Sequence, residues 1–201
     1  VRTLATPLVP TALDVVSPLA SSDACALLAR FESGVEAMED QAARFAELAR
    51  SSDLECHDAA GDEEASLWER LRPLPADPSH AAARLTLKAS LLPTEVAAWL
   101  ERLRECAHRD GPTVRWRAHA GHGIVYAHLE GAESALVPVV EPLRAAAVEH
   151  HGSLVVWDAP PALAQQVDVW GPSPALAMMR RLKASFDPHS TLNPGRYIGR
   201  I

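Results

Sequence analysis

The stretch VRWRAHAGHGIVYAHLE, residues 114–130, combines two strand-like segments with a tight turn between them. Apolar and polar side chains alternate up to His119, a pattern typical of a strand with one buried face and one polar face. Gly121 and Gly123 bracket a short connection, and residues 124–130 follow as an antiparallel partner. The stretch therefore predicts a β-hairpin with His119 at its turn.

Regular elements flank this hairpin on both sides. Alternating apolar and polar residues predict a strand over residues 84–91, and helical spacing predicts a helix over residues 94–108. After the hairpin, residues 136–150 have a mostly helical pattern and residues 154–157 form an apolar strand. The order from residue 84 to 158 is β-α-β-β-α-β, the ferredoxin-like arrangement. We expect an α+β fold in which helices cover one face of an extended antiparallel sheet.

Caps, prolines and tryptophans refine these elements. Thr94 is expected to cap its helix. Pro138 and Pro142 predict a late start or a kink in the following helix. Trp157 and Trp170 are expected to pack in the core rather than border a flavin. Three further tryptophans fall on inward faces and are also predicted core residues: Trp68, Trp99 and Trp116.

The sheet face opposite the predicted helices is polar. Basic side chains recur there at every second position of the strands, which is typical of a face that is not buried in the core. We therefore expect this face to meet another domain. Its basic residues are Arg84, Lys88, Arg115, Arg117 and His119.

The first part of the chain is extended. Residues 1–22 place three prolines around the apolar segment 12–16, which predicts an extended segment with one edge strand. An apolar run over residues 24–31 is consistent with a second strand.

Two helices are expected before residue 73. Ser33 and Glu36 have the spacing of a capping box and predict a helix to about Arg50. Residues 54–57 are compatible with a short strand, and Asp62 is expected to cap a second helix. This region is therefore predicted to follow a β-α-β-α order that extends the same sheet.

Composition narrows the class of protein. The chain has 201 residues, 48% of them hydrophobic and 22% charged, as in an ordinary globular protein. A formal net charge of −7 argues against nucleic acid or an anionic membrane as a partner. No apolar run reaches the roughly 20 residues of a membrane span. The isolated cysteines Cys25, Cys56 and Cys106 favour a reduced, cytoplasmic protein over a disulfide framework or a zinc site.

The last part of the chain, PSPALAMMRRLKASFDPHSTLNPGR over residues 172–196, predicts a helix followed by a polar turn. Ser173 is expected to cap the helix. Asp187 precedes a proline and is therefore pushed out of the helical region, so the helix should end there. The Asn-Pro-Gly sequence that follows forces a turn that projects Asn193 and Arg196.

This C-terminal sequence resembles the signature of FAD-linked oxidases of the vanillyl-alcohol-oxidase and D-lactate-dehydrogenase type. In that family a charged helix runs into Asp-Pro and then Leu-Asn-Pro-Gly-basic, whereas Ser190 stands here where glycine is usual. The resemblance implies a cap domain whose Asn193 and Arg196 approach an FAD held mainly by a separate N-terminal domain. Residues 1–22 would lead in from that domain, residues 23–171 would form the cap, and residues 172–201 would reach back to the flavin.

The resemblance also bears on His119. In the D-lactate and 2-hydroxyglutarate dehydrogenase branch, this turn contains two histidines that, with a later glutamate, hold a metal or the substrate carboxylate. His119 matches the first histidine, but Tyr126 stands at the second, and Trp157 with Asp158 stand at the later Glu-His pair. A divalent ion usually needs three protein ligands. We therefore expect no metal site, and His119 remains a candidate cavity-lining or catalytic residue.

This pattern of losses resembles the accessory flavoprotein subunit of bacterial glycolate oxidase. The resemblance implies a 2-hydroxyacid oxidoreductase that works with a second flavoprotein subunit and an iron–sulfur subunit, in the cytoplasm or peripheral to the inner membrane through partners. Gly121 and Gly123 lack the following helix of a dinucleotide fingerprint, so the chain alone has no evident phosphate loop and is expected to be inactive by itself.

Two other classes of function stay open at this point. One is a ferredoxin-like ligand-binding or dimerisation module without redox activity, because this architecture serves many functions. The other is a histidine-metal hydrolase built around His119 and His122. The Leu-Asn-Pro-Gly-Arg turn at residues 192–196 favours the oxidase, since a generic module has no need of it.

Overall fold

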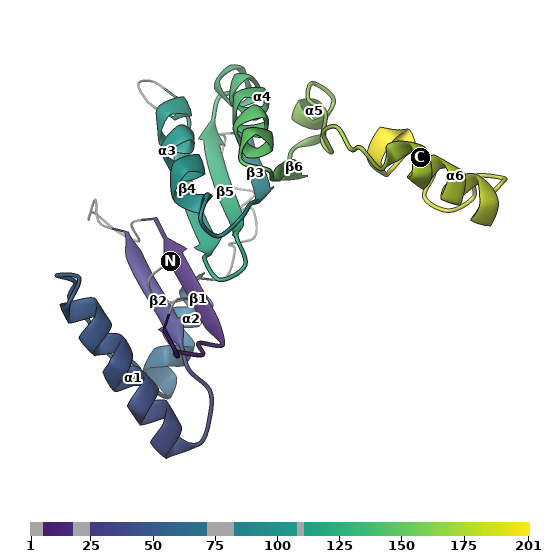
Figure 1. The fold of residues 1–201 in the computed structure, drawn as a ribbon. Coiled ribbons are helices and arrows are strands. Elements are labelled where there is room, and N and C mark those ends of the chain that lie inside the picture. The colour runs from purple at the N-terminus through teal and green to yellow at the C-terminus, as the bar shows by residue number, and fades with distance from the viewer. Residues whose placement is uncertain (1–5, 18–24, 72–82, 108–110) are drawn as a thin grey trace.

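The computed structural model describes residues 6–17, 25–71, 83–107 and 111–201, and these form one six-stranded sheet with helices around it (Figure 1). Every pair of neighbouring strands is antiparallel, and the strand order is β2-β1-β4-β5-β3-β6. The predicted α+β class is confirmed. In chain order the elements are β1 (Ala12–Val16), β2 (Ala26–Arg30), α1 (Val35–Arg50), α2 (Asp62–Leu71), β3 (Ala83–Ser90), α3 (Val96–Cys106), β4 (Thr113–His119), β5 (Ile124–Gly131), α4 (Glu133–Glu149), β6 (Ser153–Asp158), α5 (Pro161–Ala164), α6 (Leu176–Phe186) and the 3-10 turn η2 (Ile198–Arg200).

The segment from β3 to β6 has the predicted ferredoxin-like topology. In each of its two βαβ units, a strand of the other unit lies between the two strands of the unit. The alternation in β3 directs Leu85, Leu87 and Ala89 towards α3 and α4, and all three are fully buried. Trp99 on α3 is also fully buried, and its indole N–H donates to the Leu143 carbonyl on α4 at 3.1 Å. This segment from β3 to β6, which we call the body, therefore has a single continuous core.

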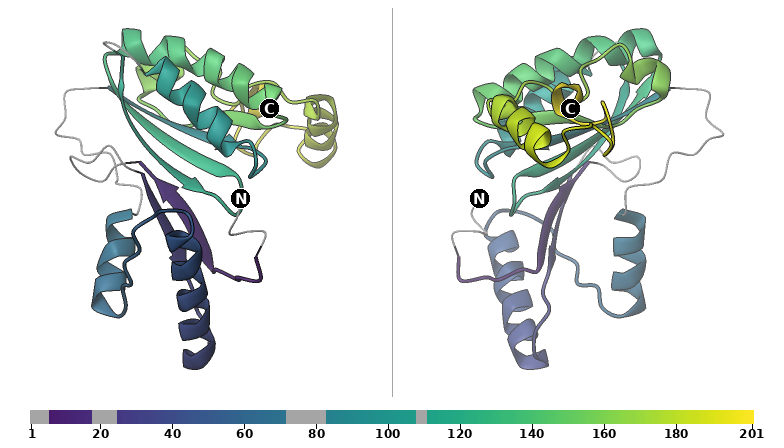
Figure 2. Two further views of the ribbon diagram at one scale, coloured as in Figure 1. Left: turned by 60° about the vertical axis from the view of Figure 1, so that its left-hand side comes forward. Right: turned by 90° about the vertical axis from the view of Figure 1, so that its right-hand side faces the viewer.

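The N-terminal elements differ from the prediction in order and place. Strand β1 lies between β2 and β4, so it is an interior strand and not an edge strand. Residues 54–57 form no strand, because Leu54 is the only aliphatic residue in that polar segment and remains half exposed. The observed order is β-β-α-α. Helices α1 and α2 lie on opposite sides of the sheet at the β1–β2 end (Figure 2, right).

Three predicted caps are displaced by one residue. Asp62 is already the first residue of α2, and the Gly61 carbonyl accepts the first helical bond, from the Ala65 N–H at 3.0 Å. Helix α1 has Gly34 as its N-cap, because the Gly34 carbonyl accepts the first helical bond from the Met38 N–H at 2.9 Å. Ser33 therefore stands one position too early for the capping box. Helix α3 has Glu95 as its N-cap, and the Thr94 hydroxyl bonds to the Glu95 carboxylate instead of to the helix backbone.

The helix predicted over residues 136–150 begins earlier, at Glu133, and includes both prolines, so the late start that the prolines suggested is wrong. Pro138 and Pro142 are exposed, so water can reach the carbonyls that lose a backbone donor at these positions. Within the described residues, no helix has the length and apolar character that crossing a membrane requires.

After β6 the chain leaves the body and forms a C-terminal arm, which we define as residues 172–201 (Figure 1). Arg144 on α4 is buried and anchors the segment just before the arm, bonding through its guanidinium to the Asp168 carbonyl. Gly171 has a φ of 71°, and a Cβ there would lie 2.7 Å from the Arg144 Nε. Only glycine therefore fits at this junction.

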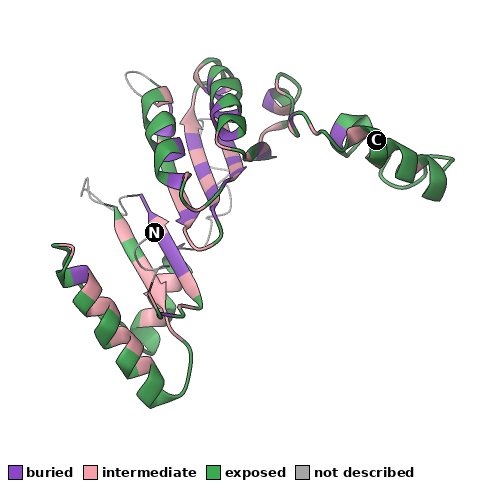
Figure 3. Cartoon of the chain, in the orientation of Figure 1, coloured by how far each residue is buried: buried purple, intermediate pink, exposed green. Residues whose placement is uncertain are grey.

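Helix α6 of the arm begins at Leu176, and Ser173 closes the turn before it by accepting the Ala175 N–H at 3.2 Å. The helix ends at Phe186 as predicted. It contains no buried residue, and Figure 3 shows the arm as mostly exposed while the strands of the body carry the buried positions.

Candidate functional site

A buried carboxylate organises the polar face of the sheet, which we call the open face because α3 and α4 lie on the other side. Asp14 on β1 is 1% exposed. Its Oδ2 accepts two hydrogen bonds from Arg117, at 2.6 and 3.2 Å, and its Oδ1 lies 2.6 Å from the His119 Nδ1. Asp14 is opposite His119 in the register of β1 and β4. The sequence did not indicate Asp14, because nothing local shows which strand pairs with β4.

Arg117 also joins this cluster to α2. Its guanidinium donates to the Leu71 carbonyl at 2.7 Å and lies 5.7 Å from the centre of the Trp68 ring. The buried Asp14 charge is thus paired and fully hydrogen-bonded, as a buried carboxylate must be to be tolerated. His119 is the member of the cluster whose side chain retains substantial exposure, 34%.

A row of aromatic and cationic side chains continues from His119 across the open face. The Tyr126 ring on β5 contacts the His119 ring edge to face, with 5.9 Å between centroids, and contacts Trp157 on β6 at the same distance. The Lys88 ammonium on β3 lies 4.9 Å from the Trp157 ring centre and 5.8 Å from that of Tyr126. The structure thus joins His119 to Tyr126, the two positions that the sequence analysis compared with a histidine pair.

The predicted core positions of Trp157 and Trp170 are wrong. Trp157 is 60% exposed because it lies opposite the buried Val156 on β6, and it is therefore part of the open face. Trp170 is 38% exposed and contacts Tyr197 of the arm, with 5.0 Å between ring centroids. Both are surface aromatics next to the candidate functional regions.

The far end of the open face is occupied by paired charges. Glu130 lies 3.3 Å from both Arg84 and Arg115. His128 is partly buried beside Arg115, and its Nδ1 lies 3.1 Å from the Thr86 hydroxyl. Burial, and secondarily the Arg115 charge, lower the pKa of His128, so it is neutral at pH 7. Lys88 differs from these residues, because no carboxylate within the described part of the chain pairs with its ammonium.

The arm carries the second candidate region, and Asp187 organises it. The Asp187 carboxylate accepts hydrogen bonds from the Thr191 N–H and hydroxyl on one oxygen, and from the Leu192 N–H and the Lys183 ammonium on the other. The Lys183 hydrogen bond, followed by the two backbone donors, holds the pKa of Asp187 far below its ordinary value. The sequence identified Asp187 only as a helix terminator, whereas its side chain shapes the turn that follows.

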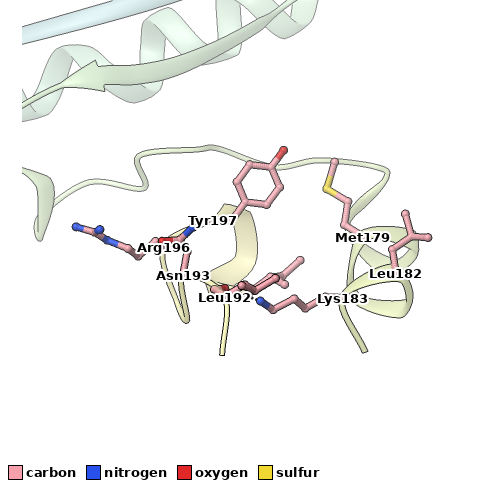
Figure 4. Close-up of a pocket in the computed structure, with 8 residues that line it drawn as sticks. Met179, Leu182, Lys183, Leu192, Asn193, Arg196 and Tyr197 are labelled. Atoms are coloured by element: carbon pink, nitrogen blue, oxygen red, sulfur yellow. Dashed lines mark hydrogen bonds between the residues drawn. The ribbon is translucent and has the colours of Figure 1, made fainter. Parts of the chain in front are cut away.

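This turn presents both predicted flavin-contacting residues at the surface. Asn193 and Arg196 border an open hollow of about 630 Å³ between α6 and the C-terminus (Figure 4). Asn193 has a φ of 45° and Gly195 a φ of 72°, so the Asn-Pro-Gly sequence supplies the left-handed conformations that the turn requires. The hollow is otherwise lined by Met179, Leu182, Lys183, Leu192, Tyr197 and Ile201.

The structure does not bring the two regions together. The arm extends beyond β6, away from the hairpin that carries His119 (Figure 1). His122 is exposed at the hairpin turn, and within the described residues no group of three histidine, cysteine or acidic side chains is arranged to hold a metal ion. His119 is therefore associated with Asp14 and Tyr126, and not with His122 or with the arm.

The residues of the arm fit part of FAD. The Asn193 amide and the Arg196 guanidinium have no side-chain partner among the described residues, and apolar side chains adjoin them in the hollow. Such donors beside an apolar surface suit the carbonyl oxygens and the flat ring system of a flavin. Gly121 and Gly123 do not provide for a pyrophosphate, because they lie in a hairpin turn that leads into β5 and not into a helix. The described residues of the arm thus offer hydrogen-bond donors of the kind that the ring side of a flavin requires.

Comparison with known families gives a match over most of the chain. The sequence model described as "FAD linked oxidases, C-terminal domain" matches residues 4–155 and 170–197. The unmatched residues 156–169 run from the second half of β6 to just before the arm. No curated protein was found to match the chain.

Proposed function

Because the chain belongs to the FAD-linked oxidases, as their C-terminal domain, we propose that it is the substrate-side domain of an FAD-dependent oxidoreductase. The substrates would be small 2-hydroxy acids such as glycolate or D-lactate. The bound FAD would supply the two-electron acceptor, while this chain orients the substrate and tunes its surroundings.

The observation that supports this substrate class most directly is the composition of the open face. A 2-hydroxy acid presents a carboxylate next to a hydroxyl group. Lys88 offers an ammonium without a carboxylate partner among the described residues. His119 offers an imidazole, and both side chains contact the Tyr126 ring. A cation and a proton acceptor beside an aromatic wall match those two groups.

The arm supplies the second half of the proposal. We place Asn193 and Arg196 near the flavin ring, where a hydrogen-bond donor and a fixed positive charge stabilise the reduced, anionic ring. This placement requires the arm to lie closer to the open face in the complete flavoprotein than it does in this structure, because substrate and flavin must be in contact. The Asp187 hydrogen bonds hold the turn in one conformation, so these donors are oriented before the cofactor arrives. Preorganised donors of this kind stabilise charge without reorganisation.

We further propose that the full-length protein is an accessory flavoprotein subunit of the glycolate oxidase type. The support is the resemblance of the C-terminal signature, together with Tyr126, Trp157 and Asp158 at positions where the metal-dependent branch has ligands. Its partners would be a second flavoprotein subunit and an iron–sulfur subunit.

The first test is a visible absorption spectrum of the full-length protein before and after glycolate or D-lactate is added without oxygen. Flavin bands that bleach support an active oxidoreductase. Flavin bands that persist support an accessory role in electron transfer or structure. Protein that is purified without flavin and does not take it up would overturn the proposal and favour a binding module.

A variant tests the place of the arm. Arg196→Ala in the full-length protein should lose a charge-assisted contact to the flavin, which corresponds to a roughly 10- to 100-fold loss in FAD affinity or in the rate of flavin reduction. Arg180→Ala, which removes an exposed arginine from α6 of the same arm, is the matched control and should change neither. Equal behaviour of the two variants would exclude the assigned role of Arg196.

A further inference from the structure

Asp14 has no role in the function proposed so far, although its geometry is the most constrained of any carboxylate on the open face. It is 1% exposed, and both of its oxygens are engaged. Oδ2 accepts from Arg117 twice, and Oδ1 lies 2.6 Å from the His119 Nδ1. A carboxylate paired with a guanidinium is an acceptor only, so the His119 Nδ1 must carry a proton and donate it.

This donor role leaves His119 with one free nitrogen. In the neutral ring Nε2 is then unprotonated, and it lies on the opposite side of the imidazole from Asp14. The His119 side chain is 34% exposed on the open face, and the Tyr126 ring packs against it edge to face. The Asp14 hydrogen bond and the Tyr126 contact together determine both the tautomer and the orientation of the ring.

We propose that Asp14 is a positioning residue that holds His119 in the Nδ1–H tautomer, so that Nε2 accepts the hydroxyl proton of a 2-hydroxy acid. This inference rests on the proposed function. In the step, the O–H bond would break and its proton would pass to Nε2, while the bound FAD would supply the acceptor for the C2 hydrogen and its electron pair. The product is the 2-oxo acid, and one proton and one hydride equivalent have left the substrate.

The cluster also joins β1 to β4, so the test must separate positioning from stability. Asp14→Asn separates the two, because the amide keeps one oxygen for Arg117 and presents an NH₂ group in place of the second oxygen. Arg117 can bond only to the oxygen, which turns the NH₂ towards the His119 Nδ1 and makes that nitrogen an acceptor. The proton must then move to Nε2. The side chain at position 14 keeps its shape, but the His119 Nε2 now carries a proton and can no longer accept one.

The pair formed by His150 and Glu95 is a matched control within the chain. The His150 Nδ1 lies 2.7 Å from the Glu95 carboxylate, so this pair has the same chemical groups as His119 and Asp14. Glu95 and His150 flank helices α3 and α4, on the other side of the sheet from the open face. Glu95→Gln therefore perturbs a histidine–carboxylate pair that the proposal does not use.

The experiment uses the full-length flavoprotein labelled with ¹⁵N-histidine and assigned with His119→Asn and His150→Asn. The ring nitrogen shifts should show His119 as Nδ1–H in the wild type and as Nε2–H in Asp14→Asn. Flavin reduction by D-lactate and glycolate should fall on the order of 10²-fold or more in Asp14→Asn and in His119→Asn, but not in Glu95→Gln. His119→Asn keeps a donor to Asp14, so its unfolding temperature should stay close to that of the wild type.

Three results would overturn the inference. They are an Nε2–H tautomer in the wild type, a tautomer that does not change in Asp14→Asn, or an unchanged rate in His119→Asn. If no 2-hydroxy acid reduces the wild-type flavin, the substrate class of the proposed function fails and the proton-acceptor role fails with it. The tautomer spectra then still decide whether Asp14 positions His119.

Discussion

Strand β3 buries Leu85, Leu87 and Ala89 completely, whereas helix α6 of the C-terminal arm buries no residue at all. The body is held together by a continuous apolar core between its sheet and two helices. The arm keeps its shape through a polar cluster around Asp187 and through short turns. The comparison indicates that apolar packing holds the body, while hydrogen bonds hold the arm and leave apolar side chains such as Phe186, at 81% exposure, uncovered.

The largest expected difference is between a buried aromatic residue of the body and an exposed one of the arm, in their effect on the free energy of unfolding. Trp99→Ala in the body should lower the free energy of unfolding by about 3–5 kcal/mol, because it removes a fully buried side chain and its hydrogen bond to Leu143. Phe186→Ala in the arm should change it by less than about 0.5 kcal/mol. Urea titrations of the 201-residue chain, followed by circular dichroism, would measure both. A large loss for Phe186→Ala would show that the arm is packed within this chain.

The second test removes the polar cluster of the arm. Asp187→Asn should release the turn, since a neutral amide cannot pair with Lys183 and can accept only part of the hydrogen bonds from Thr191 and Leu192. Faster hydrogen exchange at the Thr191 and Leu192 amides, with unchanged exchange in β3, is the expected result. Asp40→Asn, in an exposed ion pair with Arg44, should leave the arm unchanged.

The same cluster predicts the direction of a pH effect. The pKa of Asp187 is lowered on folding, so the folded turn binds the carboxyl proton more weakly than the unfolded chain does. Its stabilising contribution is therefore fully present above the ordinary value of 3.8 and is lost as the pH falls below that value. Exchange at Thr191 and Leu192 should be protected from pH 7 to about 5, relative to the intrinsic rate at each pH, and lose protection only in acid. Loss of protection near neutrality would contradict this assignment.

The smallest expected effect comes from Ser190, which has a φ of 51°. Ser190→Gly relieves left-handed strain of about 1–2 kcal/mol, partly offset by the roughly 0.5–1 kcal/mol of extra freedom that glycine has in the unfolded chain. A gain of about 0.5 kcal/mol in the local stability of the arm is expected, measurable by hydrogen exchange. Ser185→Gly, inside α6, should have the opposite sign, since glycine is the poorer helix former.

Local patterns were sufficient for the order of elements from residue 84 to 158 and for the end of α6. Alternation and helical spacing depend on neighbours in sequence, and the predicted β-α-β-β-α-β order of residues 84–158 is observed. The end of α6 before Pro188 also follows from a local rule and is confirmed. The left-handed φ of Ser190 explains in physical terms why glycine is usual at that position in the resembled family.

What the sequence did not show depends on contacts between distant segments. The interior place of β1 results from pairing with β4, about 100 residues later, and Asp14 becomes meaningful only when that register sets it opposite His119. Trp157 is a different case. Its apolar side chain favoured a core position, although its alternation with Leu154 and Val156 already placed it on the open face. Here the strand periodicity was the better guide.

The junction between body and arm has a consequence for how this chain tolerates changes in length. The Val156 N–H donates to the Val169 carbonyl at 2.8 Å, so the segment between them leaves and returns to the same point of the sheet. Leu163 anchors the middle of this loop in the core, whereas Gln165 and Gln166 are exposed. Residues inserted between these two glutamines would enlarge a loop whose ends are already closed. The arm would keep its starting point, which makes this position suitable for a reporter peptide or for natural variation in loop length.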